Sequence, residues 1–286
     1  MKIAIFGMGL IGGSLGRAIL KFTDNEVYGF DLDGGALQKA SLLGAQTRAL
    51  DFDRDLQDMD MVIFALYPKA TVEAMKNVCP HLKDGAIVID TCGNKRIIFD
   101  AMTALKEQYP ALFFVGCHPM AGREFSGISH STASLFDNAY VVLVPVDQDI
   151  KTLSTVKKLF VSIGAQDVEI CTAKKHDGMI SYTSQLAHIV SSSYVKNPHC
   201  ASHAGFSAGS FRDLTRVAKL NPEMWAELFV ENKDYLVNDI DEIVKHLVEY
   251  RDAIAAGDEE NLKALLADGV RQKEAAENAR KERRKD

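Results

Sequence analysis

The first 170 residues alternate short apolar runs with segments of helical length, and this alternation leaves few folds open to the chain. The runs are rich in β-branched and aromatic residues: KIAIFG, EVYGFD, MVIFAL, AIVIDT, LFFVGC and AYVVLVP. Strands that are apolar on both faces and are separated by helices imply a parallel sheet covered by helices. ATVEAMKNVCPHL and TLSTVKKLFVSIG have apolar residues at helical spacing and are predicted to be two of those helices. We therefore expect a doubly wound α/β domain over residues 1–170.

The pattern changes over residues 171–286, where only helical periodicity is found. LVNDIDEIVKHLVEYRDAIAAG is the clearest example, and no segment there predicts a strand. The end of the chain, RQKEAAENARKERRKD, is charged on all sides. Such a segment is more simply a solvated helix end than a specific basic binding arm. The sequence thus predicts an all-helical second domain over residues 171–286.

Charge and composition favour small-molecule chemistry. The formal net charge of -6 argues against nucleic acid as the main partner, because binding phosphates requires an excess of basic residues. No run approaches the roughly 18 apolar residues of a membrane span, so no membrane partner is expected. The five cysteines are scattered and cannot all pair, which favours a reduced, cytoplasmic chain.

A glycine motif with the spacing G-x-G-x-x-G stands between the first predicted strand and the first helix. The tight turn lets backbone N–H groups reach a pyrophosphate and places a helix N-terminus beneath its charge. Asp31 ends the second predicted strand, where a carboxylate can accept from both ribose hydroxyls. That carboxylate would repel a 2′-phosphate, so the sequence predicts a Rossmann-type domain that binds NAD rather than NADP. The candidate cofactor-binding residues are Gly7, Gly9, Leu10, Ile11, Gly12 and Asp31.

His118 is the candidate catalytic residue. In open parallel sheets ligands bind beyond the carboxyl ends of the strands, which points to the loops after MVIFAL, AIVIDT and LFFVGC. The last of these loops is HPMAGREFSG and begins with His118. A base at this position can take a hydroxyl proton while a hydride leaves the same carbon.

Three further motifs resemble the prephenate dehydrogenase family of tyrosine biosynthesis, which includes arogenate dehydrogenases. They are GCHPMAG, HDGMISYTSQLAH and FRDLTRVAKLNPEMW, and they follow the glycine motif in the family's order. The resemblance extends from Lys2 to about Trp225. It implies a Rossmann domain followed by a helical dimerisation domain, and hence a homodimer. The implied reaction is the NAD-dependent oxidative decarboxylation of prephenate to 4-hydroxyphenylpyruvate, with the conversion of arogenate to tyrosine as the alternative.

The resemblance also implies roles for individual residues. His118 corresponds to the family's catalytic histidine, Arg216 to its carboxylate-binding arginine, and His188 to a histidine that contacts substrate. Glu124 corresponds to a residue that gates or lines the pocket. The spacing itself places Arg212 beside Arg216 on one helix face, although both arginines have surface carboxylates within reach as alternative partners.

HDGMISYTSQLAH predicts a polar stripe on one helix. Asp177, Ser181, Ser184 and His188 fall at i, i+4, i+7 and i+11. Such a stripe indicates a face turned toward a ligand or a buried network, and Ser184 is therefore a further substrate-binding candidate. A buried interface histidine is the alternative interpretation of His188.

The chain departs from the family pattern at three positions. Gly93 stands where many members have a serine that bonds the catalytic histidine, and Thr91, Cys92 or a water is the expected substitute. Gln185 replaces the first histidine of the family's SHLPH motif, and Arg123 replaces a common threonine. A positive charge at residue 123 is expected to favour the neutral form of His118.

Other functions fit the sequence less well. HCASH has helical metal-ligand spacing, but no third ligand accompanies it, so we expect a polar turn and no metal site. β-Hydroxyacid dehydrogenases and pyrroline-carboxylate reductases share the two-domain plan but lack the HPMAG and TRVA motifs. A protein that senses NAD(H) without turnover is the remaining alternative.

Overall fold

The computed structural model describes residues 1–123 and 125–282. By compactness the chain divides into a first unit, Met1–Lys233, and a second unit that begins at Asp234. Each unit is described by itself below. Within the described residues, none of the helices is long and apolar enough to cross a membrane.

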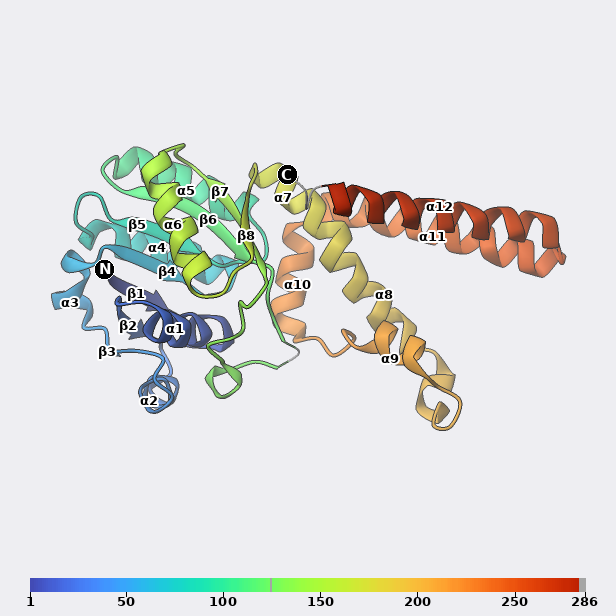
Figure 1. Ribbon diagram of the computed structural model, residues 1–286, viewed down its shortest axis with the longest axis horizontal. Helices are drawn as coiled ribbons and strands as arrows, with labels where there is room; N and C mark the ends of the chain where they lie inside the picture. Colours follow the sequence, from blue (N-terminus) through green and yellow to red (C-terminus); the bar gives the residue numbers. More distant parts are fainter. Residues whose placement is uncertain (124, 283–286) are drawn as a thin grey trace. The chain divides into compact units, whose positions relative to one another are not determined.

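One twisted sheet forms the centre of the first unit (Figure 1). Its order is β3-β2-β1-β4-β5-β6-β7-β8. In chain order the strands are β1 Lys2–Phe6, β2 Glu26–Phe30, β3 Arg48–Ala49, β4 Met61–Phe64, β5 Ile87–Asp90, β6 Phe113–Pro119, β7 Tyr140–Pro145 and β8 Asp167–Ile170. This order, with β1 in the middle and the chain winding outward in both directions, confirms the doubly wound fold.

The far edge of the sheet differs from the all-parallel prediction. β7 pairs with β6 in the antiparallel direction, and β8 then runs parallel to β7. The reason lies in the connections: residues 120–139 join β6 to β7, and their described part contains no crossover helix, only the 3-10 turn Ile128–His130. The helix α6 Ile150–Ser162, by contrast, forms a crossover between β7 and β8. β3 and β8 were not predicted, because β3 has two exposed residues and β8 carries two acidic residues at the sheet edge.

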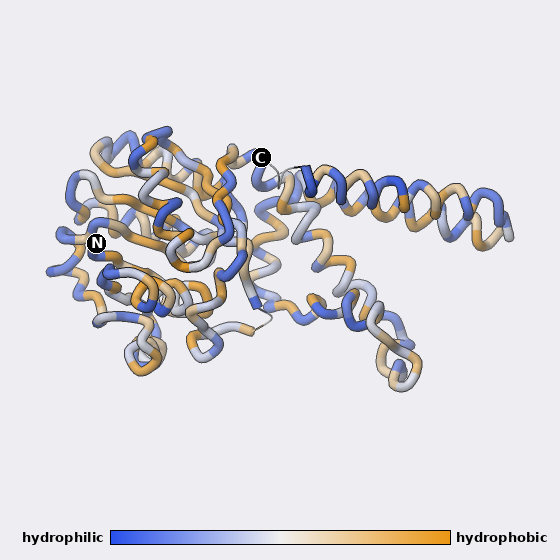
Figure 2. The backbone as a smooth tube through the Cα atoms, viewed as in Figure 1, coloured by the Kyte–Doolittle hydropathy of each residue, from blue (hydrophilic) through white to orange (hydrophobic). Residues whose placement is uncertain are grey.

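Helices cover both faces of the sheet, as predicted. They are α1 Leu10–Phe22, α2 Gly34–Leu42, α3 Phe52–Asp55, α4 Pro68–Val78, α5 Arg96–Gln108 and α6 Ile150–Ser162. Alternation along β1 sends Ile3 and Ile5 into the core with α1 and α6, and Ala4 and Phe6 into the core with α4 and α5. The strands are mainly hydrophobic in Figure 2, as burial on both faces requires.

Every regular element after Ile170 in the described chain is helical. The first unit continues with α7 Ala173–Ile180, a π-helical segment Ser181–Leu186, α8 Ala187–Tyr194, α9 Gly209–Thr215 and α10 Pro222–Glu231. α11 Lys233–Ala256 and α12 Glu259–Glu282 form a helical hairpin, and Gly257 between them has a φ of 67°. The predicted domain boundary at residue 170 stays a prediction, since α7 to α10 belong to the first compact unit.

Close packing of α1 against the segment before β3 leads to a first prediction. A Cβ added at Gly16 would lie 1.9 Å from the carbonyl oxygen of Ala45. Gly16→Ala should therefore destabilise the protein by about 1–3 kcal/mol, measured by urea unfolding. Gly34→Ala is the matched control, because a Cβ there meets no atom within 4 Å. Equal unfolding midpoints for the two variants would contradict the packing argument.

Candidate active site

The three glycines of the motif meet two different needs. Gly7 has a φ of 93°, and a Cβ there would lie 2.4 Å from the carbonyl oxygen of Ala65. At Gly12 a Cβ would lie 1.9 Å from the carbonyl oxygen of Gly7. A Cβ at Gly9 meets no atom of the protein within 4 Å. Gly7 and Gly12 thus permit the turn, and Gly9 leaves the space into which a pyrophosphate fits.

The start of α1 supplies donors beside that space. Gly9 is the N-cap residue, and the first intrahelical bond runs from Gly13 N to Gly9 O at 3.0 Å. The N–H groups of Leu10, Ile11 and Gly12 precede that bond and have no acceptor within the helix. Together with the helix dipole they form an anion site of the kind that dinucleotides use.

Asp31 is held next to the glycine turn. It directly follows β2, and its Oδ2 accepts a hydrogen bond from the backbone N–H of Met8 at 2.7 Å. Its Oδ1 accepts from the backbone N–H of Asp33 at 2.9 Å. Each carboxylate oxygen keeps a second lone pair, so the group can still accept from ribose hydroxyls. Turn, helix end and carboxylate together fit NAD.

His118 lies at the same edge of the sheet as this turn. β1, β4, β5 and β6 run parallel, so that their carboxyl ends share one edge. His118 is the last residue but one of β6, and the residue is partly exposed. The structure therefore places the candidate base and the glycine turn at the same carboxyl edge of the sheet, as the sequence predicted.

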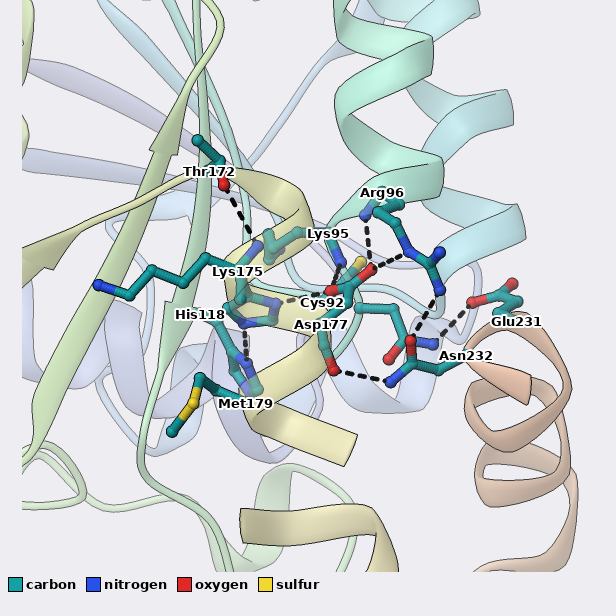
Figure 3. Close-up of polar contacts among 12 residues, drawn as sticks. Cys92, Lys95, Arg96, His118, Thr172, Lys175, Asp177, Met179, Glu231 and Asn232 are labelled. Carbon is teal, nitrogen blue, oxygen red and sulfur yellow. Dashed lines mark hydrogen bonds and ion pairs between the residues drawn. The ribbon is translucent and has the colours of Figure 1, made fainter. Parts of the chain in front are cut away.

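A chain of two imidazoles and a carboxylate leads away from His118. Nδ1 of His118 and Nε2 of His176 share a hydrogen bond of 2.9 Å. Nδ1 of His176 lies 2.7 Å from Oδ1 of Asp177. Asp177 also accepts from the backbone N–H groups of Lys95 at 2.7 Å and Arg96 at 2.9 Å (Figure 3). The middle of α7 is thereby tied to the start of α5 and to the end of β6.

A buried ion pair bonds to the backbone next to His118. Lys95 and Asp90 are fully buried and bond to each other through Nζ and Oδ2. The Asp90 carboxylate also accepts from the backbone N–H groups of Cys92 at 2.7 Å and Cys117 at 3.0 Å. The pair thus fixes the loop after β5 against the residue next to His118. Removing one partner would leave an uncompensated charge in the core.

Both histidines are held in the neutral form. Burial lowers the pKa of His118 well below 6.5, and the nearby His176 and Lys95 lower it further. Burial also lowers the pKa of His176, although its hydrogen bond to Asp177 opposes the shift. His118 therefore has a lone pair available for a proton at neutral pH. The positive charge near it is Lys95, whereas Arg123, which the sequence analysis assigned to this effect, is exposed.

The predicted polar stripe is altered by the π-helical segment between α7 and α8. Asp177 and Ser181 are buried as expected, but the next buried polar residue is Gln185, and Ser184 is only half-buried. A π-helical turn contains more residues than an α-helical turn, so it moves the inward position by one residue. Asp177 and Ser181 thus face a buried network that Gln185 continues, whereas the role of Ser184 in substrate binding stays a prediction.

Gln185 joins a buried amide network. Its Nε2 donates to Asn94 Oδ1 at 2.9 Å, and its Oε1 accepts from Asn232 Nδ2 at 2.8 Å. Asn232 also donates to the carbonyl oxygen of Asp177 at 2.9 Å and accepts from Arg96 at 2.9 Å (Figure 3). Gln185 thus connects the loop after β5 with α7 and with the end of α10.

The structure also accounts for Gly93. A Cβ at this position would lie 3.3 Å from Leu228 Cδ2, so a larger residue would press on α10. Cys92, an expected substitute for the family serine, is buried and contacts Thr71 Oγ1 at 3.3 Å. The residue that bonds His118 is His176, the first residue of HDGMISYTSQLAH, and the sequence analysis did not predict this contact.

The described residues predicted to bind substrate lie in the helical part of the first unit. Arg212 lies in the last turn of α9, Arg216 follows that helix, and both are exposed. His188 on α8 donates from Nδ1 to the carbonyl oxygen of Val217 at 3.0 Å, and its ring centroid lies 4.0 Å from that of Trp225. His188 and the residue after Arg216 are thus brought together. Glu124 lies outside the described residues.

Two models of known domains match the chain. "Prephenate dehydrogenase, nucleotide-binding domain" matches residues 15–169, and "Prephenate dehydrogenase, dimerization domain" matches residues 172–268. The chain belongs to the prephenate dehydrogenase family. A relative in this family is the prephenate dehydrogenase of Bacillus subtilis (strain 168), which is 31% identical over 270 residues, 91% of this chain and 72% of the relative.

Two solved structures place the same family on this fold. Prephenate dehydrogenase from A. aeolicus in complex with hydroxyphenyl propionate and NAD+ superposes with a TM-score of 0.83 at 27% identity, covering 96% of this chain and 98% of that one. Arogenate dehydrogenase from Synechocystis gives a TM-score of 0.78 at 26% identity, covering 96% and 99%. The Rossmann sheet and the helices that follow it are therefore shared along nearly the whole chain.

The open space at Gly9 can be tested directly. Gly9→Ala should leave the urea-unfolding midpoint unchanged, because a Cβ there meets no protein atom within 4 Å. The same Cβ would occupy the space for the pyrophosphate, so the dissociation constant for NAD should rise by roughly tenfold or more. Calorimetric titration measures this, with Gly34→Ala as the control for an added methyl group elsewhere. Unchanged NAD affinity would place the pyrophosphate elsewhere.

Glu231 at the end of α10 leads to a prediction on pH. Burial raises its pKa to about 7, against a hydrogen bond from Asn94, and Glu227 adds to the rise. A carboxyl whose folded pKa is raised destabilises the fold as pH increases from its ordinary value near 4.5 to 7. Glu231→Gln should therefore raise the urea midpoint at pH 8 and have a much smaller effect at pH 4.5. Equal effects at both pH values would contradict the prediction.

Proposed function

We propose that the protein catalyses the NAD-dependent oxidative decarboxylation of prephenate to 4-hydroxyphenylpyruvate. The observation that carries this proposal is the position of a neutral, partly exposed His118. It lies at the same edge of the sheet as the glycine turn. Family membership and the relatives named above support the same activity.

The reaction needs a base, a hydride acceptor and a loss of carbon dioxide. His118 takes the proton of the hydroxyl on the ring carbon, and NAD bound at the glycine turn would supply the acceptor for the hydride of that carbon. The bond from the opposite ring carbon to its carboxylate breaks, and its electrons make the ring aromatic. A base with a lowered pKa is unprotonated before the reaction begins, as this step requires.

The residues proposed to bind the substrate carry groups that suit its two carboxylates. Arg216 and Arg212 offer guanidinium groups that engage carboxylates bidentately. His188, Ser184 and Glu124 are proposed to line the same pocket. We propose Gly7, Gly9, Leu10, Ile11, Gly12 and Asp31 as the NAD site, on the geometry of the turn, the helix end and the carboxylate.

Arogenate is the second candidate substrate. It differs from prephenate only by an amino group in place of the keto group on the side chain, and a solved relative of the same fold is an arogenate dehydrogenase. We further propose that the protein acts in the cytoplasm as a homodimer formed through its helical domain. The match of residues 172–268 to a dimerization domain supports the dimer.

A direct assay tests the function. Purified protein with NAD and prephenate should produce reduced cofactor, followed by absorbance, and a parallel assay with arogenate compares kcat/KM for the two substrates. Faster turnover of arogenate would make arogenate the substrate. Absence of turnover with both, in protein that binds NAD by calorimetry, would reject the dehydrogenase function and favour an NAD(H) sensor.

His118→Asn tests the proposed base. The variant should lower kcat by roughly 100-fold or more and leave NAD affinity nearly unchanged, as expected for loss of a general base. In the unmodified protein kcat/KM should fall with acid only well below pH 6.5, because burial lowers the pKa of His118. His81→Gln, at an exposed histidine after α4, is the control. Normal turnover by His118→Asn would remove His118 from the mechanism.

A further inference from the structure

We propose that Asp177 and His176 are positioning residues that fix the tautomer of His118, so that its Nε2 is the nitrogen that accepts the substrate proton. The inference rests on the proposed function and adds to it how the base is prepared.

First, the carboxyl group of Asp177 is ionised. Its carboxylate lies within hydrogen-bond distance of the backbone N–H groups of Lys95 and Arg96 and of Nε of Arg96. Burial opposes ionisation, but the hydrogen bond with His176 and those from the backbone N–H groups of Arg96 and Lys95 hold the pKa of Asp177 below its ordinary value. An ionised carboxylate only accepts hydrogen bonds. Nδ1 of His176, which lies 2.7 Å from Oδ1, must therefore carry a proton.

The second step follows from the chemistry of imidazole. A neutral imidazole carries one N–H and one lone pair. With its proton on Nδ1, His176 has only the lone pair at Nε2. The 2.9 Å contact between this atom and Nδ1 of His118 is then a hydrogen bond that His118 donates. The lone pair of His118 is left on Nε2, the nitrogen that takes no part in this chain.

This tautomer is imposed by the fold. A neutral histidine free in water prefers its proton on Nε2, which would leave no lone pair there for the substrate. The charged groups packed around the pair are Asp177, Arg96 and the mutually bonded Lys95 and Asp90. The Asp177 carboxylate lies 2.7 Å from Nδ1 of His176, so this carboxylate decides which nitrogen of His176 is protonated.

The same arrangement stabilises His118 after it has taken the proton. The imidazolium formed then donates from Nδ1 to His176, which in turn donates to the Asp177 carboxylate two bonds away. This is the role that an aspartate plays beside the histidine of a serine protease triad, with one more imidazole between them. In this chain the support for His118 thus comes from α7, whereas Gly93 in the loop after β5 offers no side chain.

The nitrogen-15 spectrum of the histidines in the unmodified protein tests the proposal without any substrate. At neutral pH, Nε2 of His118 should have the shift of an unprotonated, pyridine-type nitrogen, and Nδ1 that of a protonated, pyrrole-type nitrogen. His118→Asn assigns the signals by removing them. A proton found on Nε2 of His118 would overturn the proposal, whether or not any variant folds.

Two variants of His176 then separate positioning from packing. His176→Phe keeps the ring but has no acceptor, so the proton of His118 should return to Nε2 and kcat should fall by roughly 100-fold. His176→Gln keeps an oxygen in reach of His118 and should restore the spectrum and much of kcat. KM and NAD affinity should stay within about twofold in both. Equal spectra for the two variants would overturn the proposal.

The spectrum also separates the proposed dehydrogenase function from the proposed tautomer of His118. The expected tautomer in a protein that turns over neither prephenate nor arogenate would reject the proposed function and leave the assignment of His176 and Asp177 intact. Turnover of prephenate with a proton on Nε2 of His118 would reject the assignment and leave the function intact.

Discussion

The carboxylate of Asp177 is the interaction on which the organisation of the site depends. It receives the backbone N–H groups at the start of α5, bonds His176, and lies on the first helix after the sheet. A helix N-terminus has unpaired N–H donors, and a carboxylate satisfies them both by hydrogen bonding and by charge. One side chain from the helical part of the first unit thereby caps a helix of its sheet domain and orients the histidine that leads to His118.

The contacts around Asp177 are costly to break, because they are buried. A buried donor or acceptor that loses its partner costs about 1–3 kcal/mol, whereas the bond itself contributes less. Asn232, Gln185 and Asn94 are almost fully buried and satisfy one another. Such a network permits few alternative arrangements, so the end of α10, the π-helical segment and the loop after β5 are specified together.

Two departures from the family pattern therefore meet in one place. Gly93 lies against Leu228, and the neighbouring Asn94 donates to the carbonyl oxygen of the same Leu228 at 2.9 Å. Gln185, in place of a histidine, bonds Asn94 from the other side. The loop that carries a serine in many family members is thus held here by amides and by close packing against α10.

The sequence by itself determined the layered α/β fold, the helical second half, the glycine turn and the position of His118 at the sheet edge. These follow from periodicity and from short-range rules: strands buried on both faces are apolar throughout, and Gly7 and Gly12 are required by backbone geometry. Tertiary structure alone decided the antiparallel β7, the shift from Ser184 to Gln185, and the contact of His118 with His176. These depend on connections and packing between residues far apart in the chain, 58 positions in the case of the two histidines, and no local pattern records such a distance.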